Sequence, residues 1–319
     1  MKIKYNLRFS LAFIAKLTAA VLVFLLSLLI MPFYIGGDQV NYRIVYEALP
    51  DLDLTEGFLF YYRYTTSTEY VHFYLSWLAS RFIEKDIFIA FANAIFAYVA
   101  MSLFLKWKVS VVIAFLLVIT NYYFFVLYFA AERLKFGFIF LALSLTHIDQ
   151  VKRFYGFAVL AVISHIQVLI AYGTILFNFI VRRMLKLFRT LKGSKSLFLV
   201  PLLFIPLLLV EDQIIYKFQS YYRERPLADL AKVFMFLLLA LCYSNKKSNT
   251  VMMFVPVIIA VFLVGGDRVN VFGYFIFLYY ALQFRGGWNF GVFATSLYFA
   301  YATINFVINV IQGGEGFSA

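Results

Sequence analysis

The sequence has few charged residues and only one cysteine, and both scarcities limit what the protein can be. Charged side chains account for 14% of the 319 residues, whereas 64% are hydrophobic and the mean hydropathy is +0.87. This balance is typical of chains whose solvent is lipid rather than of soluble globular proteins. The lone Cys242 allows neither an intrachain disulfide nor a cysteine metal cluster. The sequence therefore predicts an integral membrane protein without redox chemistry.

Motifs for nucleotides and metals are also missing from the sequence. It contains no G-x-x-x-x-G-K-[ST] phosphate loop, no G-x-G-x-x-G dinucleotide motif, no H-E-x-x-H and no cluster with zinc spacing. An enzyme with this sequence would have to work without ATP. We expect no cofactor and no metal.

Long apolar runs dominate what is present. A helix needs about 20 nearly uncharged residues to cross the hydrocarbon core of a membrane, and such runs recur along the chain. We predict an all-α polytopic protein with ten or eleven transmembrane helices and short re-entrant or interfacial helices. The predicted spans are 12–35, 87–105, 109–131, 134–149, 154–164, 167–181, 197–215, 227–243, 251–266, 269–284 and 288–311.

The distribution of basic residues predicts a cytoplasmic N-terminus. With that orientation most Lys and Arg residues, including those of a basic loop at 182–196, lie on the inner side, as the positive-inside rule requires. The first apolar run is too long for a signal peptide, so we expect it to remain as a span. The net charge of +12 then faces anionic lipid, and no nucleic-acid partner is expected. We treat 1–319 as a single membrane domain with a periplasmic loop and amphipathic helix at 36–86.

The hexapeptide GGD[QR]VN occurs twice, at 36–41 and 265–270, each time after an apolar run that ends on the predicted outer face. After the first copy, Asp38, Tyr42 and Tyr46 are spaced four apart and fall on one side of a helix. They could form a functional stripe. Alternatively, Asp38 caps an ordinary interfacial helix and the tyrosines belong to the aromatic belt.

Several ionisable residues lie within or beside predicted spans, where they are candidates for function. Glu69 opens the stretch EYVHFYLSWLASRF, which could face a cavity or form a helix on the membrane surface. Arg133 follows Glu132 directly, and adjacent residues on a helix pair poorly, so Arg133 is a candidate for binding an anion. Further arginines predicted on the outer face are Arg223, Arg225 and Arg268.

A histidine interrupts the apolar stretch between Arg153 and Arg183, which is too short for two straight spans and too long for one. We expect a hairpin of short helices with His165 and Gln167 at its turn. Histidine titrates near neutral pH, so His165 could transfer a proton, or it could be a structural residue with satisfied hydrogen bonds.

Taken in order, these motifs resemble the EpsG-like branch of the Wzy polymerases, over roughly 30–285. The resemblance rests on Gly37-Asp38 with Tyr42 and Tyr46, Glu69 in EYVHFYLSWL, Arg133, His165 in SHIQVLIAY, and Arg268. The sequence differs from the family pattern at Gln39, where a small hydroxyl residue is common, and at Tyr70, where proline often follows the glutamate.

The resemblance implies a GT-C-like glycosyltransferase of the bacterial inner membrane. Such enzymes join undecaprenyl diphosphate-linked oligosaccharide units into O-antigen, capsule or exopolysaccharide at the periplasmic face, and a chain-length regulator is a possible partner. The catalytic candidates are Asp38, Glu69 and His165, with His165 or Asp38 favoured as base. Assigned to the diphosphate are Arg133, Arg268, Arg223 and Arg225, and to sugar Tyr42, Tyr46 and Gln167. An O-antigen ligase and a lipid-linked oligosaccharide flippase or other transporter stay open as alternatives.

Overall fold

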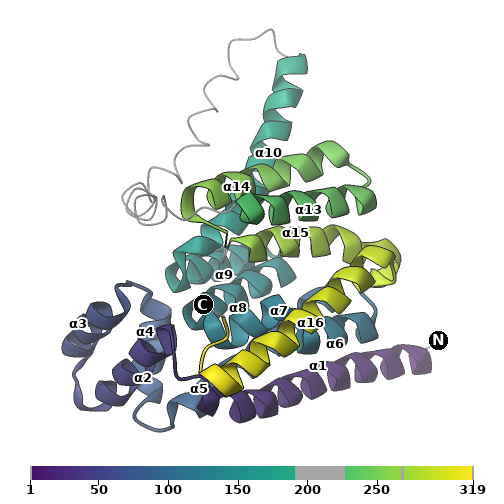
Figure 1. The fold of residues 1–319 in the computed structure, drawn as a ribbon. Helices are drawn as coiled ribbons and strands as arrows, with labels where there is room; N and C mark the ends of the chain where they lie inside the picture. Colours follow the sequence, from purple (N-terminus) through teal and green to yellow (C-terminus); the bar gives the residue numbers. More distant parts are fainter. Residues whose placement is uncertain (1, 191–226, 267–268, 318–319) are drawn as a thin grey trace. The chain divides into compact units, whose positions relative to one another are not determined.

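The computed structural model describes residues 2–190, 227–266 and 269–317 (Figure 1). Helices make up 85% of the structure, and no strand occurs in the described ranges. The prediction of an all-α protein is therefore confirmed.

Within the described residues, four helices are long and apolar enough to cross a membrane. Their apolar stretches are Leu11–Phe33, Lys85–Lys106, Ile166–Met184 and Phe290–Gly313. These stretches lie on α1 (Lys2–Ile30) with η1 (Met31–Phe33), α5 (Lys85–Lys106), η4 (Ile166–Val168) with α10 (Leu169–Thr190), and α16 (Phe290–Gly313). A pair of helices bent by 54°, Val111–Thr120 and Tyr122–Ala130, could provide a fifth span. All five coincide with predicted spans.

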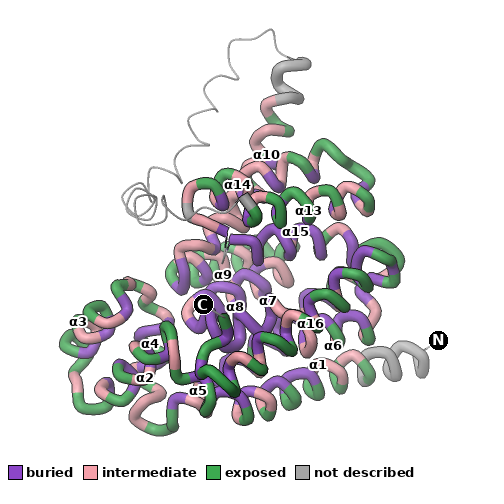
Figure 2. The backbone as a smooth tube through the Cα atoms, in the orientation of Figure 1, coloured by how far each residue is buried: buried purple, intermediate pink, exposed green. Residues whose placement is uncertain are grey.

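The predicted number of spans, ten or eleven, exceeds these four or five helices. Five more predicted spans are helical but shorter or more polar: α8 (Glu132–Thr146), α9 (Val151–Ser164), α13 (Leu227–Tyr243), α14 (Lys247–Val264) and α15 (Asn270–Gln283). Hydropathy finds apolar helices, but it does not separate a helix covered by lipid from one covered by protein. Most of α8, for example, is buried inside the structure (Figure 2). The predicted span 197–215 lies outside the described residues, and the first part of the predicted loop 182–196 continues α10 as far as Thr190.

The chain divides into two compact units, Met1–Val168 with Arg285–Ala319, and Leu169–Phe284. In the first unit α1 packs against α5, α5 against α8, and α8 against α9. In the second unit α13 packs against α14 and α15, and α14 packs against α10. Buried aromatic side chains fill both interiors, among them Phe96, Phe124 and Tyr128 in the first unit and Phe236, Tyr274 and Phe277 in the second.

The predicted periplasmic loop 36–86 is largely helical in the structure. It consists of α2 (Asp38–Ala48), η2 (Leu49–Asp51), α3 (Leu54–Thr65) and α4 (Tyr70–Ala79), followed by the start of α5. Asp53 caps α3 by accepting hydrogen bonds of 2.8 Å from the backbone N–H groups of Thr55 and Glu56. A small core of Val45, Leu49, Tyr61 and Phe73 holds the three helices together. This core fixes where α4, and with it Glu69, begins.

A break in the backbone separates α8 from the preceding helices. The side chain of Asn121 accepts a hydrogen bond of 3.1 Å from the backbone of Tyr123 and so starts α7 (Tyr122–Phe125). A π-helical turn, Val126–Ala130, follows, and Ala131 leaves helical geometry with φ −101° and ψ 56°. Consequently Glu132 and Arg133 lie in the first turn of a new helix rather than in the middle of a long one.

Both GGD motifs place a glycine against a carboxylate side chain from a distant part of the chain. A Cβ added to Gly36 would lie 2.3 Å from Cγ of Glu315, and the N–H of Gly37 donates a hydrogen bond of 2.9 Å to the carboxylate of that residue. A Cβ added to Gly266 would lie 2.3 Å from both Cβ and Cγ of Asp229. In each motif one glycine, Gly36 or Gly266, thus leaves space for an acidic side chain.

This packing predicts that Gly266→Ala is more damaging than Gly36→Ala. Asp229 has a short side chain that starts on α13 and cannot move aside, whereas the longer Glu315 side chain can rotate away. We expect Gly266→Ala to lower the free energy of unfolding by about 1–3 kcal/mol, the usual result of overpacking. Thermal unfolding in detergent measures it. Gly156→Ala is the control, because nothing lies within 4 Å of the new Cβ. Equal losses of stability in Gly266→Ala and Gly36→Ala would contradict the prediction.

Candidate functional site

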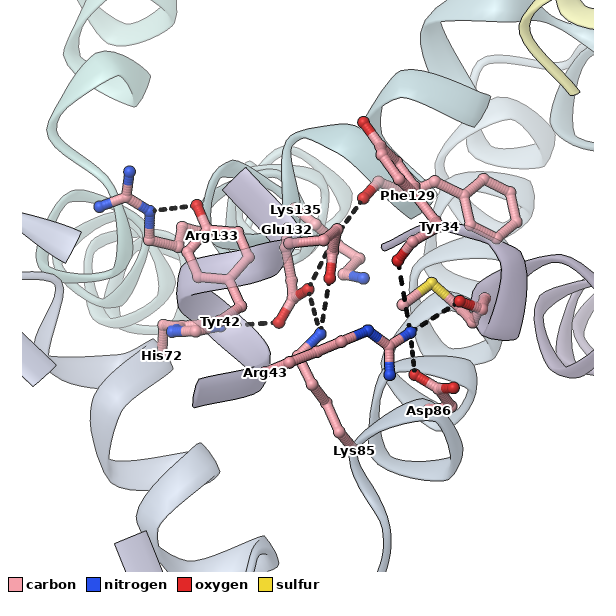
Figure 3. A network of polar contacts seen from close by, with 12 residues as sticks. Tyr34, Tyr42, Arg43, His72, Lys85, Asp86, Phe129, Glu132, Arg133 and Lys135 are labelled. Carbon is pink, nitrogen blue, oxygen red and sulfur yellow. Dashed lines mark hydrogen bonds and ion pairs between the residues drawn. The ribbon is translucent and has the colours of Figure 1, made fainter. Parts of the chain in front are cut away.

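Tyr42, Glu69, Arg133 and His165 meet in the first unit, and we call them the site cluster. Oε2 of Glu69 lies 2.7 Å from Nη1 of Arg133, and Oε1 of Glu69 lies 3.1 Å from Nε2 of His165. Nε of Arg133 donates a hydrogen bond of 2.8 Å to the hydroxyl of Tyr42 (Figure 3). Ser67 donates a further hydrogen bond to Glu69. Glu69 is therefore the centre of the cluster, because it binds both the arginine and the histidine.

The local backbone explains why these side chains converge. Gly37, with φ 57°, directly precedes α2, on which Tyr42 lies. Glu69 is the residue immediately before α4, and Arg133 is the second residue of α8. Three helices therefore begin beside the same site, and His165 joins them from the end of α9.

The partners of His165 determine its tautomer. The residue is extended, with φ −161°, and its Nδ1 atom lies 3.2 Å from the backbone N–H of Gln167. Since that N–H can only donate, Nδ1 accepts, and the proton of a neutral ring lies on Nε2 and points to Glu69. Both ring nitrogens are thus engaged, and His165 in this arrangement holds Glu69 rather than accepting a proton.

A second group of polar side chains lies beside the site cluster and is more deeply buried than Glu69 and Arg133. It consists of Gln39, His72, Lys85 and Glu132, and we call it the buried layer. Glu132 accepts hydrogen bonds from Lys85 over 2.9 Å and from His72 over 3.2 Å (Figure 3). It accepts another from Gln39 over 3.0 Å. The amide oxygen of Gln39 accepts a bond of 2.8 Å from Lys85. Each carboxylate of the two groups therefore binds one histidine and one cation.

Electrostatics differ between the two groups. Burial by itself raises the pKa of Glu69, but the neighbouring His165 and Arg133 outweigh it and hold the pKa of this carboxyl below its ordinary value. Burial lowers the pKa of His72, although Glu132 acts in the opposite direction, so the ring is neutral at pH 7. Burial also raises the pKa of Tyr61, whose hydroxyl lies 3.1 Å from Nδ1 of His72 and donates to it. His72 is therefore satisfied at both nitrogens.

Comparison of the chain with protein-family models, with curated proteins and with solved structures gives no match. Function has to be argued from the site itself.

The structure brings together the predicted site residues of the site cluster, and the backbone of the predicted Gln167 contacts His165. Of the predicted tyrosine stripe, Tyr42 enters the site cluster, whereas the hydroxyl of Tyr46 donates to the carbonyl of Ile83 over 3.0 Å. Asp38 is the first residue of α2, and its side chain is exposed. The predicted diphosphate ligands Arg223, Arg225 and Arg268 lie outside the described residues.

Gln167 contacts the site cluster through its backbone, and the oxygen of its side chain has no partner within the described residues. Its N–H binds Nδ1 of His165, whereas its Oε1 atom is buried and accepts no hydrogen bond from any residue that the structure describes. A buried acceptor without a donor is costly, so Oε1 of Gln167 fits a hydroxyl supplied by a ligand.

The buried layer was not predicted from the sequence as a site. Glu132 was considered only as an unsuitable partner for Arg133, and His72 lies within the Glu69 motif without being recognised. The available signal was the presence of Lys85 and Glu132 beside strongly apolar segments, where charged residues require a reason.

The chemistry available at the site is that of anion binding combined with a carboxylate base. Nη2 of Arg133 makes no hydrogen bond within the described residues, and the arginine side chain is 14% exposed, so a ligand can reach it. Guanidinium groups suit phosphate oxygens in particular. Among the described residues no three His, Cys, Asp or Glu side chains form a group that could hold a metal ion.

Proposed function

We propose that the protein is a glycosyltransferase that polymerises undecaprenyl diphosphate-linked oligosaccharide units into O-antigen or a related surface polysaccharide. The observation that carries this proposal is the meeting of Tyr42, Glu69, Arg133 and His165 in one partly exposed cluster. Each belongs to a motif of the EpsG-like resemblance, and they come from four separate parts of a chain with membrane-spanning helices. A GT-C-like architecture and a periplasmic active site in the inner membrane are parts of the same proposal.

Arg133 is the proposed ligand of the diphosphate leaving group. Its Nε and Nη1 atoms bind Tyr42 and Glu69, which leaves Nη2 as a donor for a ligand, and the guanidinium stays protonated at any physiological pH. Glu69 already balances one positive charge, so a diphosphate requires further cations. The resemblance to the EpsG-like polymerases alone assigns that role to Arg268, with Arg223 or Arg225 in support, and these three residues lie outside the described part of the chain.

Glu69 is the proposed general base. Transfer breaks the bond between C1 of the donor sugar and the diphosphate oxygen, and it forms a bond from C1 to the acceptor hydroxyl oxygen, whose proton passes to the base. His165 directs its own N–H at Glu69 and its Nδ1 at the backbone, so neither ring nitrogen accepts the proton, whereas the lowered pKa of Glu69 keeps that carboxylate ionised and able to take the proton as the acceptor oxygen bonds to C1. This geometry supports Glu69 over His165, the reverse of the order that the sequence favoured. Tyr42 and Gln167 would bind sugar hydroxyls.

Complementation tests the proposal. The gene is deleted in its host and restored as wild type, Arg133→Ala, Arg268→Ala or Arg63→Ala, and the surface polysaccharide is displayed on a gel. Arg63 is an exposed residue of α3 and serves as the matched control. We expect deletion to reduce a ladder to single-repeat glycan, and wild type and Arg63→Ala, but not the other two variants, to restore it at normal expression. Unchanged polymer length after deletion would refute a polymerase.

A transporter or flippase for the same lipid-linked glycan is the second candidate. The observation that favours it is the pair of buried charges Lys85, the first residue of a candidate span, and Glu132, since ionisable residues within or beside spans often form ion or proton pathways. The same gel separates the two candidates, because loss of a flippase removes all surface glycan, including single repeats. A chain-length regulator as partner belongs only to the polymerase proposal.

A further inference from the structure

The buried layer has no access to a substrate. The side chains of Glu132, His72 and Lys85 are 2%, 4% and 7% exposed, and Gln39 is buried as well. In the site cluster, by contrast, the side chains of Glu69 and Arg133 are 12% and 14% exposed. The buried layer can therefore affect function only by positioning residues of the site cluster.

The two groups are built from the same three helix starts. Along the chain Gln39 is three residues before Tyr42, His72 is three residues after Glu69, and Glu132 directly precedes Arg133. In each pair one member belongs to the buried layer and the other to the site cluster. In the site cluster, Tyr42 of α2 and Glu69 before α4 both contact Arg133 of α8. In the buried layer, Gln39 of α2 and His72 of α4 both contact Glu132 of α8, so side-chain contacts join the same three helix starts a second time.

The polar groups of the buried layer pair with one another in the present arrangement. A carboxylate in a protein interior is strongly unfavourable unless its oxygens are paired, and Glu132 has Lys85, Gln39 and His72 as its donors. His72 in turn is fixed by the hydroxyl of Tyr61 on its other nitrogen. A change in the spacing of α4 and α8 would break the contact between His72 and Glu132 and leave a buried charge with one donor fewer.

We propose that His72 and Glu132 are positioning residues that hold the start of α4 against the start of α8 and thereby set the contact between Glu69 and Arg133. Neither residue touches the substrate. On this proposal the 2.7 Å ion pair of the site cluster depends on the neighbouring contact, 3.2 Å between Nε2 of His72 and Oε1 of Glu132, which ties the start of α4 to the start of α8.

A double-mutant cycle measures how far the interaction between Glu69 and Arg133 depends on His72, and it needs no assay of activity. Glu69→Gln and Arg133→Met are made singly and together, and the midpoint of thermal unfolding is measured for the purified full chain in detergent. In the wild-type background the double variant should lose less than the sum of the single losses, because the two residues interact. In a His72→Leu background this difference should disappear.

A matched background separates positioning from general destabilisation. Phe104 lies at the opposite end of α5 from Lys85, is 1% exposed and packs against Trp107 and Phe124. Phe104→Leu should lower the unfolding midpoint yet leave the interaction between Glu69 and Arg133 intact. If His72→Leu does not fold, Tyr61→Phe, which removes only the hydroxyl that fixes His72, takes its place and should weaken the interaction. Unchanged interaction between Glu69 and Arg133 in the folded test background overturns the proposal.

Rescue by a conservative variant provides the second readout. Glutamine can direct an N–H group at Glu132 as Nε2 of the histidine does, so His72→Gln should restore the interaction that His72→Leu loses. The same variants in the complementation strain should give a polymer ladder for His72→Gln and none for His72→Leu. This arm rests on the proposed function, whereas the unfolding cycle does not. Failure of wild type to restore a ladder therefore counts against the polymerase alone, and a normal ladder from a folded His72→Leu counts against the positioning role.

Discussion

Replacing Glu132 by alanine is expected to lower the free energy of unfolding by about 3–5 kcal/mol, the largest loss of stability that we predict for a single substitution. The variant leaves Lys85 buried with its charge uncompensated and removes the acceptor that His72 and Gln39 share. The midpoint of thermal unfolding of the purified protein in detergent gives the measurement, and the folded yield after extraction should fall with it.

Two controls show whether the loss comes from the buried charge. Asp149→Ala removes the partner of Lys106 in an ion pair whose carboxylate side chain is 80% exposed, and its effect should be close to zero. Replacing Lys85 and Glu132 together by Met and Leu removes both charges at once and should recover much of the stability that Glu132→Ala loses. A Glu132→Ala protein as stable as Asp149→Ala would show that no charge is buried there.

Replacing Glu69 by glutamine is expected to reduce the rate of polymer formation by about 10²–10⁴-fold, the usual contribution of a positioned general base. Glutamine has nearly the same shape but cannot take a proton, and it leaves Arg133 and His165 without their common anion. Purified protein supplied with lipid-linked repeat units, with the products separated on a gel over time, gives the rate.

Asp38→Asn provides the comparison for this rate measurement. The exposed Asp38 at the start of α2 should matter much less than Glu69, so Asp38→Asn should stay close to wild type. His165→Ala should lie between the two, because it removes a hydrogen bond to the base rather than the base itself. If all three variants react near the wild-type rate, the assignment of the base is wrong.

The sequence singled out the residues of the site cluster as candidates, but it did not predict how they pair. Glu69, Arg133 and His165 were recognisable because a charge or an imidazole beside apolar runs needs an explanation. Their mutual contacts were not, since residues 69, 133 and 165 are joined only by the packing of α4, α8 and α9. His165 was favoured as base because histidine titrates near neutral pH, and only the backbone N–H at its Nδ1 atom argues otherwise.

The buried layer was missed for a related reason. A residue next to Arg133 was judged as a partner for Arg133, although adjacent positions on a helix point in different directions and each can serve a separate group. Similarly, hydropathy located the helices of the predicted spans but not the break at Ala131, where neither proline nor glycine marks the end of a helix. Without that break Glu132 would be assigned to the interior of a span.

The positions of the three helix starts have an electrostatic consequence. Both carboxylates, Glu69 directly before α4 and Glu132 as the first residue of α8, lie where unpaired backbone N–H groups give a helix the positive end of its dipole. That interaction favours negative charge by about 0.3–1 kcal/mol on a surface and up to about 2 kcal/mol when partly buried. Part of the charge balance of the site thus comes from the main chain, and no side-chain substitution removes it. An inserted residue at either start would turn the following side chains by about 100° and separate each carboxylate from its partners.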